Sequence, residues 1–281
     1  MKNEKVAPAP DQRSKPIGVF DSGIGGLTVV RALTEKLPNE NIVYFGDTAR
    51  VPYGPKSPAV VREYAADDID ILLQHDVKMV VVACNTVSAV ALDVVQKRAR
   101  MPVVGVIVPG AEAAGRATTK KRIGVIGTYA TINSNSYTNA LRHIDAAIKT
   151  FPQPCPLFVP LAEEGWVDHP VTQMVAREYL FPLTVQKIDT LILGCTHYPV
   201  LREAIAAAIG ASVTLIDSGA ATAEEVVRVL TDKDLLNPST QRPNLQFFVS
   251  DIPTKFTEVG EQFLGRSLGK VRKIPIGEKR T

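Results

Sequence analysis

The stretch "VVVACNTVSAV", Val80–Val90, decides the fold of this chain, because an apolar run ends there on Cys84 and a helical pattern begins. A second stretch, "LILGCTHYPVL", Leu191–Leu201, has the same order of an apolar run, Cys195, a threonine and a helical pattern. Short β-branched apolar runs are typical of parallel strands whose sheet is covered by helices on both faces. Two such junctions predict an α/β protein with an internal repeat.

The rest of the chain alternates in the same way between short apolar runs and amphipathic stretches. Apolar residues recur at helical spacing from Leu27 to Leu37, from Val61 to Leu72 and from Leu201 to Ile209. Alternation of strands and helices predicts parallel sheets with right-handed crossovers. The expected strands are Ile17–Phe20, Asn41–Phe45, Met79–Ala83, Pro102–Val106, Arg122–Ile126, Pro156–Pro160, Thr190–Leu193, Val213–Ile216, Gln246–Val249 and Val271–Ile274.

The internal repeat extends beyond the two cysteines. "PIGVFDSGIGG" from Pro16 resembles "RIGVIGTYAT" from Arg122, at nearly the offset that separates the cysteines. The chain therefore has two related halves of roughly 100 residues each, an ordinary domain size. A weaker echo links "FDSG" at Phe20–Gly23 with "IDSG" at Ile216–Gly219. The repeat leaves open whether the final segment extends the second half or returns to the first.

Composition excludes several classes of function. The 281 residues are 45% hydrophobic and carry a net charge of +3, with no long run of either sign, which gives no argument for nucleic acid or a membrane surface. No stretch approaches the roughly 18 apolar residues that span a bilayer. Residues 1–15 lack the apolar region of a signal peptide and are predicted to be a disordered tail. Three cysteines are no disulfide framework, so we expect free thiols in the cytoplasm.

The position of the two thiols suggests chemistry. In open α/β sheets, ligands bind at the carboxyl ends of the strands, where Cys84 and Cys195 are both predicted. A helix N-terminus there is expected to lower a thiol's pKa. A single cysteine would be read as a small buried hydrophobe, but the duplicated context favours reactivity. No cysteine or histidine spacing predicts a metal site. Cys155 lies between two prolines, has no matching cysteine in the other half, and is interpreted as structural.

Other polar residues occupy similar strand-end loops. "DSGIGG", Asp21–Gly26, is either an anion site or a tight turn in which Asp21 or Ser22 caps a helix. "GDTARVPYGPKS", Gly46–Ser57, is a restricted loop in which Tyr53 could offer a hydroxyl. His197, two residues after Cys195, is either a core histidine or a catalytic one. Glu163, after an expected strand, is either a solvated loop charge or an acid–base group.

Taken together, "GVFDSGIGGLTV", "YFGDTARVPYG", "VVACNTVSA" and "LILGCTHYPVL" resemble the glutamate racemases, cofactor-independent isomerases that make D-glutamate for peptidoglycan. The resemblance covers the chain from Ile17 to its C-terminus. It implies two pseudo-symmetric α/β domains, each a mostly parallel sheet flanked by helices, with the active site in the cleft between them. The first domain would comprise residues 16–108 and 218–281, and the second residues 109–217, after the tail of residues 1–15.

The resemblance also assigns roles residue by residue. Cys84 and Cys195 would be the catalytic acid–base pair. Asp21, Glu163 and His197 would support the thiols. The resemblance implies L- and D-glutamate as the small-molecule substrate, no cofactor, no metal, no nucleic acid, no membrane partner, and a homodimer as a further expectation. The substrate-binding residues would be Asp21, Ser22, Tyr53, Gly54, Asn85, Thr86, Thr196 and His197.

Three other readings stay open at the level of sequence. An aspartate or hydantoin racemase, or a racemase of broader specificity, could share paired cysteines on the same duplicated fold. A two-lobed amino-acid-binding protein without turnover would share the fold but has no need for two thiols. A redox dithiol protein would need the two Cα atoms within roughly 7 Å, which leaves no room for a substrate between them.

Overall fold

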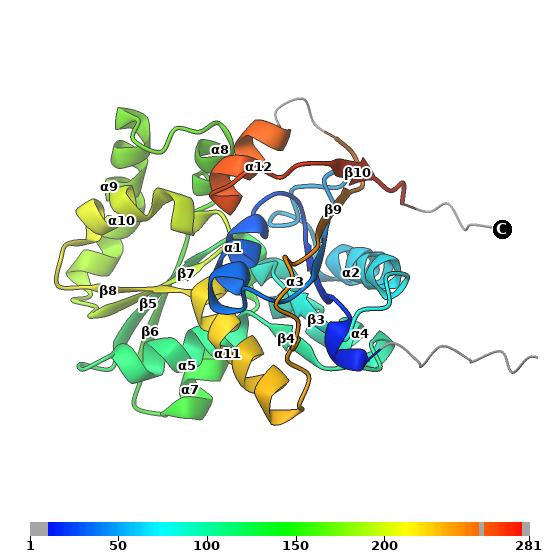
Figure 1. Ribbon diagram of the computed structural model, residues 1–281. Coiled ribbons are helices and arrows are strands. Elements are labelled where there is room, and N and C mark those ends of the chain that lie inside the picture. The colour runs from blue at the N-terminus through cyan, green and yellow to red at the C-terminus, as the bar shows by residue number, and fades with distance from the viewer. Residues whose placement is uncertain (1–10, 253–255, 277–281) are drawn as a thin grey trace, which may run out of the picture.

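A computed structural model describes residues 11–252 and 256–276 and contains two parallel sheets that lie beside each other (Figure 1). The first sheet has the strand order β10-β9-β2-β1-β3-β4, with strands Val271–Lys273, Leu245–Val249, Ile42–Gly46, Ile17–Asp21, Met79–Val82 and Val103–Gly105. The second has the order β6-β5-β7-β8, with strands Lys149–Pro154, Arg122–Gly127, Thr190–Gly194 and Thr214–Asp217. All pairings are parallel, which confirms the predicted α/β class.

Helices flank both sheets and bury their central strands. Every residue of β1, β2, β3 and β7 is buried, which explains their continuous apolar sequences. In the described part of the chain, no helix is long and apolar enough to cross a membrane. The helices are α1 Leu27–Lys36, α2 Pro58–Leu73, α3 Asn85–Val90, α4 Leu92–Arg98, α5 Ile107–Ala117, α6 Tyr129–Asn133, α7 Ser136–Ile144, α8 Phe158–Glu163, α9 Pro170–Val185, α10 Arg202–Ile209, α11 Ser218–Asp232 and α12 Phe256–Leu264, with the 3-10 turns η1 Gln12–Ser14 and η2 Tyr198–Leu201.

The chain visits the two sheets in order and then comes back. It builds β1 to β4 in the first sheet and β5 to β8 in the second, and β9 and β10 then join the first sheet beside β2. Helix α11 makes the return and packs against both α1 and α5, as Figure 1 shows between the two sheets. The final segment therefore returns to the first sheet and does not extend the second.

Parallel register brings the functional loops to one edge of each sheet. In the first sheet, Asp21 pairs with Gly46 and Phe20 with Val82, so the loops after β1, β2 and β3 leave together. In the second sheet, Gly127 pairs with Gly194, which aligns the ends of β5 and β7 in the same way. Such carboxyl-terminal edges are where open α/β sheets bind ligands.

One predicted strand is wrong. Residues 156–157 form a turn and residues 158–160 begin helix α8, while the strand lies earlier, at β6. Strand β6 sits at a sheet edge, where prolines are tolerated because their missing N–H groups need no partner. The apolar run belongs to a helix whose buried residues Phe158, Leu161 and Ala162 follow helical spacing. Glu163 consequently ends a helix and does not follow a strand.

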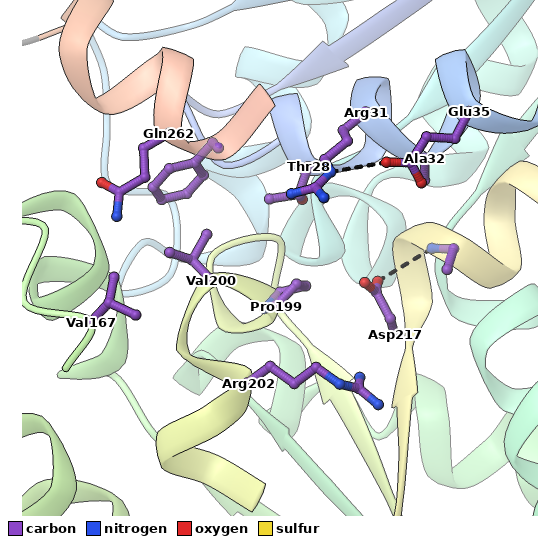
Figure 2. Close-up of a pocket in the computed structure, with 12 residues that line it drawn as sticks. Thr28, Arg31, Ala32, Glu35, Val167, Pro199, Val200, Arg202, Asp217 and Gln262 are labelled. Atoms are coloured by element: carbon purple, nitrogen blue, oxygen red, sulfur yellow. Dashed lines mark hydrogen bonds and ion pairs between the residues drawn. The ribbon is translucent and has the colours of Figure 1, made fainter. Parts of the chain in front are cut away.

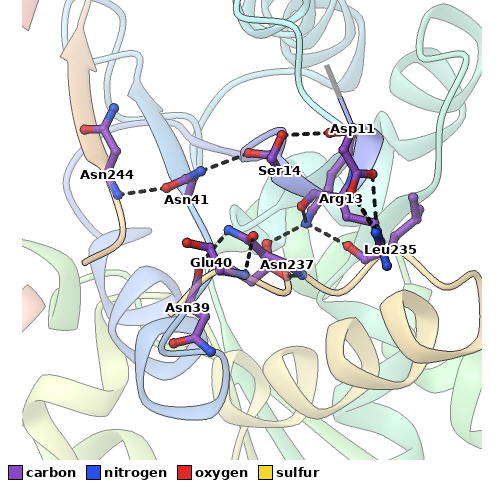
Figure 3. Close-up of polar contacts among 11 residues, drawn as sticks. Asp11, Arg13, Ser14, Asn39, Glu40, Asn41, Leu235, Asn237 and Asn244 are labelled. Carbon is purple, nitrogen blue, oxygen red and sulfur yellow. Dashed lines mark hydrogen bonds and ion pairs between the residues drawn. The ribbon is translucent and has the colours of Figure 1, made fainter. Parts of the chain in front are cut away.

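The prediction of a disordered tail is wrong for residues 11–15, whereas residues 1–10 lie outside the described residues. The buried ammonium of Lys78 donates to the carbonyls of Arg13 at 2.6 Å and Leu235 at 2.8 Å, and pairs with Glu40 at 2.6 Å. Asn41 also donates to the carbonyl of Ser14 at 2.9 Å (Figure 3). Composition missed this docking because the tail contributes main-chain acceptors, which a buried cation requires.

Candidate functional site

Strand-end loops of both sheets enclose a cavity of about 350 Å³. The first sheet contributes the loops after β1, β2 and β3, and the second contributes the loops after β5 and β7 together with helix α8. The cavity therefore lies between the two repeated halves. Its lining residues are Ser22, Val51, Pro52, Tyr53, Gly54, Pro55, Cys84, Asn85, Thr86, Thr128, Tyr129, Pro156, Val159, Pro160, Glu163, Cys195, Thr196 and His197.

Two free thiols reach this cavity from different sheets. Cys84 follows β3 and caps α3, while Cys195 follows β7, and both are buried. The Cys84 Sγ donates to the Ser22 Oγ at 3.6 Å. The Cys195 Sγ lies 3.8 Å from the Nδ1 of His197. The structure therefore brings the two predicted cysteines together around one space that a small molecule could occupy.

The expected lowering of the thiol pKa is wrong for Cys84. Burial raises the pKa of Cys84 to about 12, and the negative charge of Asp21 raises it further. Hydrogen bonds from Val87 and Ser22 act in the opposite direction without offsetting burial. Helix α3 has only six residues and cannot supply a strong dipole. Cys84 is consequently a protonated thiol at neutral pH.

His197 carries a positive charge beside the other thiol. Its Nε2 lies 2.9 Å from the Oε1 of Glu163. Burial alone would lower the pKa of His197, but hydrogen bonds to Cys195 and Glu163 outweigh it and raise the pKa to about 10. Phe263 of α12 packs edge-on against the imidazole, with ring centroids 5.4 Å apart. The imidazole is therefore held between the Cys195 sulfur and the Glu163 carboxylate.

Asp21 lies behind the cavity wall and is not among its lining residues. Its fully buried carboxylate accepts a hydrogen bond from the Gly23 N–H at 3.0 Å and one from the Thr196 hydroxyl at 3.5 Å. Burial raises the pKa of Asp21, and the charge of His197 lowers it in part. Asp21 therefore joins a loop of the first sheet to the Cys195 loop of the second.

Tyr53 lines the cavity, but its hydroxyl is used elsewhere. The hydroxyl donates to a carboxylate oxygen of Asp47 and also lies 3.1 Å from Asp68. Arg50 binds the same two carboxylates, at 2.5 Å from Asp47 and 3.0 Å from Asp68. Burial and the neighbouring Asp47 raise the pKa of Asp68. This buried network fixes the loop after β2, so that its main chain faces the cavity.

Two direct contacts hold the halves together across the cavity. The carbonyl of Gly54 accepts a hydrogen bond from the Ala130 N–H at 3.0 Å. The hydroxyls of Thr86 and Thr128 lie 3.0 Å apart. Gly54 has to be a glycine here, because a Cβ would lie 2.8 Å from the Thr128 side chain. The cavity is therefore closed by contacts that one added methyl group would disturb.

Several lining residues were not predicted from the sequence. Thr128 and Tyr129 follow β5 at the place where Ser22 and Gly23 follow β1, so the repeat "RIGVIGTYAT" carried a signal for them. The apolar wall had no sequence signal, because isolated prolines and valines in loops and in the first turn of a helix have no distinctive pattern. This wall consists of Val51, Pro52, Pro55, Pro156, Val159 and Pro160.

Other candidate features lie outside this cavity. Cys155 is buried and its Sγ donates to the carbonyl of Gln153 at 3.6 Å, as a structural cysteine would. Among the described residues, no group of three His, Cys, Asp or Glu could hold a metal ion. A second cavity of about 460 Å³ is lined by Arg31, Arg202 and Asp217 among others (Figure 2). It contains no thiol and is therefore no candidate for the same chemistry.

Comparisons with known proteins agree with this geometry. Residues 17–226 match the sequence model of a family described as Asp/Glu/Hydantoin racemase. The chain is 53% identical to a glutamate racemase of Chlorobaculum tepidum over 260 residues, which are 92% of this chain and 96% of the relative. The crystal structure of a glutamate racemase from Francisella tularensis, in complex with D-glutamate, superposes with a TM-score of 0.88. That match has 43% identity and covers 93% of this chain and 98% of the other.

A more distant likeness shows the fold alone. The aspartate racemase of Picrophilus torridus is 19% identical, with a TM-score of 0.55 over 79% of this chain and 98% of the other. The chain is thus much more similar to the glutamate racemases described above than to this aspartate racemase.

Proposed function

This chain belongs to the Asp/Glu/Hydantoin racemase family, and we propose that it interconverts L- and D-glutamate by proton transfer between two thiols and the α-carbon. The observation that supports the mechanism is the pair of free, buried cysteines that line one cavity from different sheets. Inversion requires that a proton leave one face of the α-carbon and another arrive at the opposite face. Two opposed groups accomplish this without the substrate having to turn over.

The surroundings of the two sulfurs suggest which one is the proton donor and which one is the base before the reaction begins. Cys84, with a pKa raised to about 12, serves as the proton donor in the resting enzyme. Cys195, beside the His197 imidazolium, serves as the base. In this assignment Cys195 removes the proton of L-glutamate while Cys84 protonates the opposite face. With D-glutamate the two roles are reversed. Cys84 must then be the base and Cys195 the proton donor, so the thiol proton must first be on Cys195.

The carbanion formed at the α-carbon is the main energetic difficulty. We assign its stabilisation to hydroxyl groups that line the cavity, namely those of Ser22, Thr86 and Thr196, and to the N–H groups at the start of α3. Asn85 lines the same cavity and binds the substrate. Tyr53 and Gly54 contribute main chain from the opposing loop. Because the halves contact each other across the cavity, bound substrate would be shielded from water, which strengthens these interactions.

The remaining expectations are part of the same proposal. The first domain would comprise residues 16–108 and 218–281 and the second residues 109–217, a division supported by the membership of the two sheets. The reaction would need no cofactor. D-glutamate would supply peptidoglycan synthesis in the cytoplasm, and the homodimer stays a prediction.

Single-cysteine variants test the two-thiol mechanism. Cys84→Ala and Cys195→Ala should each abolish racemisation, because one face of the α-carbon then lacks its acid or base. In D₂O, Cys84→Ser should still exchange the α-proton of L-glutamate, and Cys195→Ser that of D-glutamate, as followed by NMR. Exchange of the opposite enantiomers would reverse the two roles. Full racemisation by either alanine variant would refute the mechanism.

Substrate specificity is tested with the unmodified protein. Turnover of glutamate should exceed that of aspartate by about 10³ or more, because polar groups placed for one substrate are left unpaired by another. Circular dichroism of the amino acids measures both rates. Equal rates would indicate a racemase of broader specificity, and glutamate binding without turnover would indicate a binding protein.

A further inference from the structure

Asn85 lines the cavity, and two hydroxyl groups hold its side chain from outside it. The residue begins α3 and is 3% exposed. Its Nδ2 lies 2.9 Å from the hydroxyl of Tyr137 on α7 and 3.3 Å from the hydroxyl of Ser218, the first residue of α11. All three side chains are buried, and they come from three separate parts of the chain. This contact therefore joins the loop that carries Cys84 to helix α7 and to the returning helix α11.

The hydrogen bonds around Ser218 fix the orientation of the amide. The Ser218 hydroxyl donates its single proton to the carbonyl of Leu193 at 3.1 Å. Its oxygen can then only accept from Asn85, and Nδ2 is the only donor on that side chain. The network thereby resolves which end of the amide is nitrogen. The nitrogen faces Ser218 and Tyr137, and Oδ1 points away from them.

The Oδ1 atom of Asn85 indicates what this side chain binds. It is buried and has no hydrogen-bond partner in the part of the chain that the structure describes. A buried amide oxygen without a donor is unfavourable, and such an atom in a native protein requires an explanation, of which a role at a functional site is one. Asn85 lines the substrate cavity, so the missing donor would come from the substrate.

The backbone leaves space for the two hydroxyl-bearing side chains. A Cβ on Gly194 would lie 2.5 Å from the carbonyl oxygen of Ile126, its nearest obstacle, and 3.0 Å from the Cε2 of Tyr137. A Cβ on Gly110 would lie 3.3 Å from the Tyr137 hydroxyl and 3.2 Å from the Cβ of Ser218. Two glycines on different elements thus admit the ring, its hydroxyl and the serine at once. The arrangement is built into the packing of β7, α5, α7 and α11.

We propose that Tyr137 and Ser218 are positioning residues that present the Oδ1 of Asn85 to the ammonium group of the substrate. This inference rests on the proposed glutamate racemase function and names how one end of the substrate is recognised. An ammonium group only donates hydrogen bonds, so it requires an acceptor. If the amide turned over, its NH₂ group would face the ammonium group, donor against donor. The Ser218 hydroxyl gives its proton to Leu193 and has none to offer a turned Oδ1, so it opposes this turn, and the Tyr137 hydroxyl holds Nδ2 from a second side.

The variants Tyr137→Phe and Ser218→Ala remove one hydroxyl each. We expect KM for both glutamate enantiomers to rise about tenfold, with kcat changed less than about threefold, because a buried hydrogen bond is lost without removing an acid or base. The Kd for D-glutamate, measured by calorimetry, should rise by the same factor as KM. As a matched control, Tyr179→Phe removes a hydroxyl that accepts from the Leu157 N–H, away from Asn85, and should leave KM unchanged.

A double-mutant cycle separates positioning from general loss of packing. In an Asn85→Ala background there is no amide to orient, so Tyr137→Phe should change KM and Kd less than about twofold. Equal losses in both backgrounds, or an unchanged KM for Tyr137→Phe in the native background, would refute the positioning role. Glutamate binding without turnover by the unmodified protein would refute the proposed function, while the Kd cycle still decides the positioning role. A protein that neither binds nor racemises glutamate would refute both.

Discussion

Replacing Gly54 by alanine should hold the cavity open, because the new methyl group would meet the second half of the molecule. A Cβ at this position would lie 2.8 Å from the Cβ of Thr128 and 2.9 Å from its Cγ2. Both obstructing atoms belong to a branched side chain that cannot rotate away at its Cβ. The loop after β2 must therefore retreat from the loop after β5.

The size of the retreat follows from ordinary carbon contacts. These are about 3.5–4.0 Å, so the loops must separate by about 1 Å. A displacement of that size at a substrate-positioning group can cost about 10²-fold in rate. The hydrogen bond from the Ala130 N–H to the Gly54 carbonyl, now 3.0 Å, would also lengthen, with a net cost of about 1 kcal/mol. We therefore expect kcat/KM for glutamate to fall between about 10- and 100-fold.

Steady-state racemisation followed by circular dichroism measures the loss, and thermal unfolding checks that the fold persists. Gly115→Ala serves as a matched control, because its methyl group would meet only the Ile144 side chain on the molecule's surface. Removing the obstruction is a second test. In a Thr128→Gly background, Gly54→Ala should lower kcat/KM by less than about threefold, since the side-chain atoms that its methyl group would meet are then absent and the two mutations are non-additive.

Two outcomes would refute this reasoning. If Gly54→Ala retained the kcat/KM of the native protein, the contact between Gly54 and Thr128 would not control closure. If the loss were equally large in the Thr128→Gly background, the effect would come from Gly54 alone and not from a clash between the halves.

Two further predictions concern pH and the N-terminal segment. The pKa of His197 is raised, so the imidazolium stabilises the folded state fully below pH 6.5 and loses this contribution as pH rises through about 10. Because Glu163 helps to raise that pKa, Glu163→Gln should move the alkaline limb of the activity profile to lower pH by about one unit. An unmoved limb would contradict the pairing of the two residues. Deleting residues 2–14 removes the Arg13 carbonyl that accepts from the buried Lys78, and should lower the midpoint of thermal unfolding by about 3–8 °C. Deleting residues 2–10 leaves that acceptor in place and serves as the control. Equal midpoints for the two deletions would show that residues 11–14 contribute nothing to stability.

The sequence alone was sufficient for the elements whose signal is local. Strands β1, β3 and β7 were predicted because both of their faces are buried, which makes the whole strand apolar. Cys84 and Cys195 were singled out because a strand followed by a helix places its junction at a sheet edge, whatever else the chain does. The same local reasoning failed at Pro156–Pro160, where a short apolar run fits a strand and a buried helix equally well.

Only the tertiary structure decided what depends on residues far apart in the chain. The return of β9 to pair with β2 is a choice between two sheets, and no local pattern encodes it. The Tyr53 hydroxyl binds Asp47 and Asp68 and not a ligand, because those carboxylates come from the start of its own loop and from helix α2. The orientation of the Asn85 amide is likewise fixed by groups distant in sequence. Periodicity reports which face of an element is buried, whereas the direction of a hydrogen bond depends on which partners the fold brings within about 3 Å.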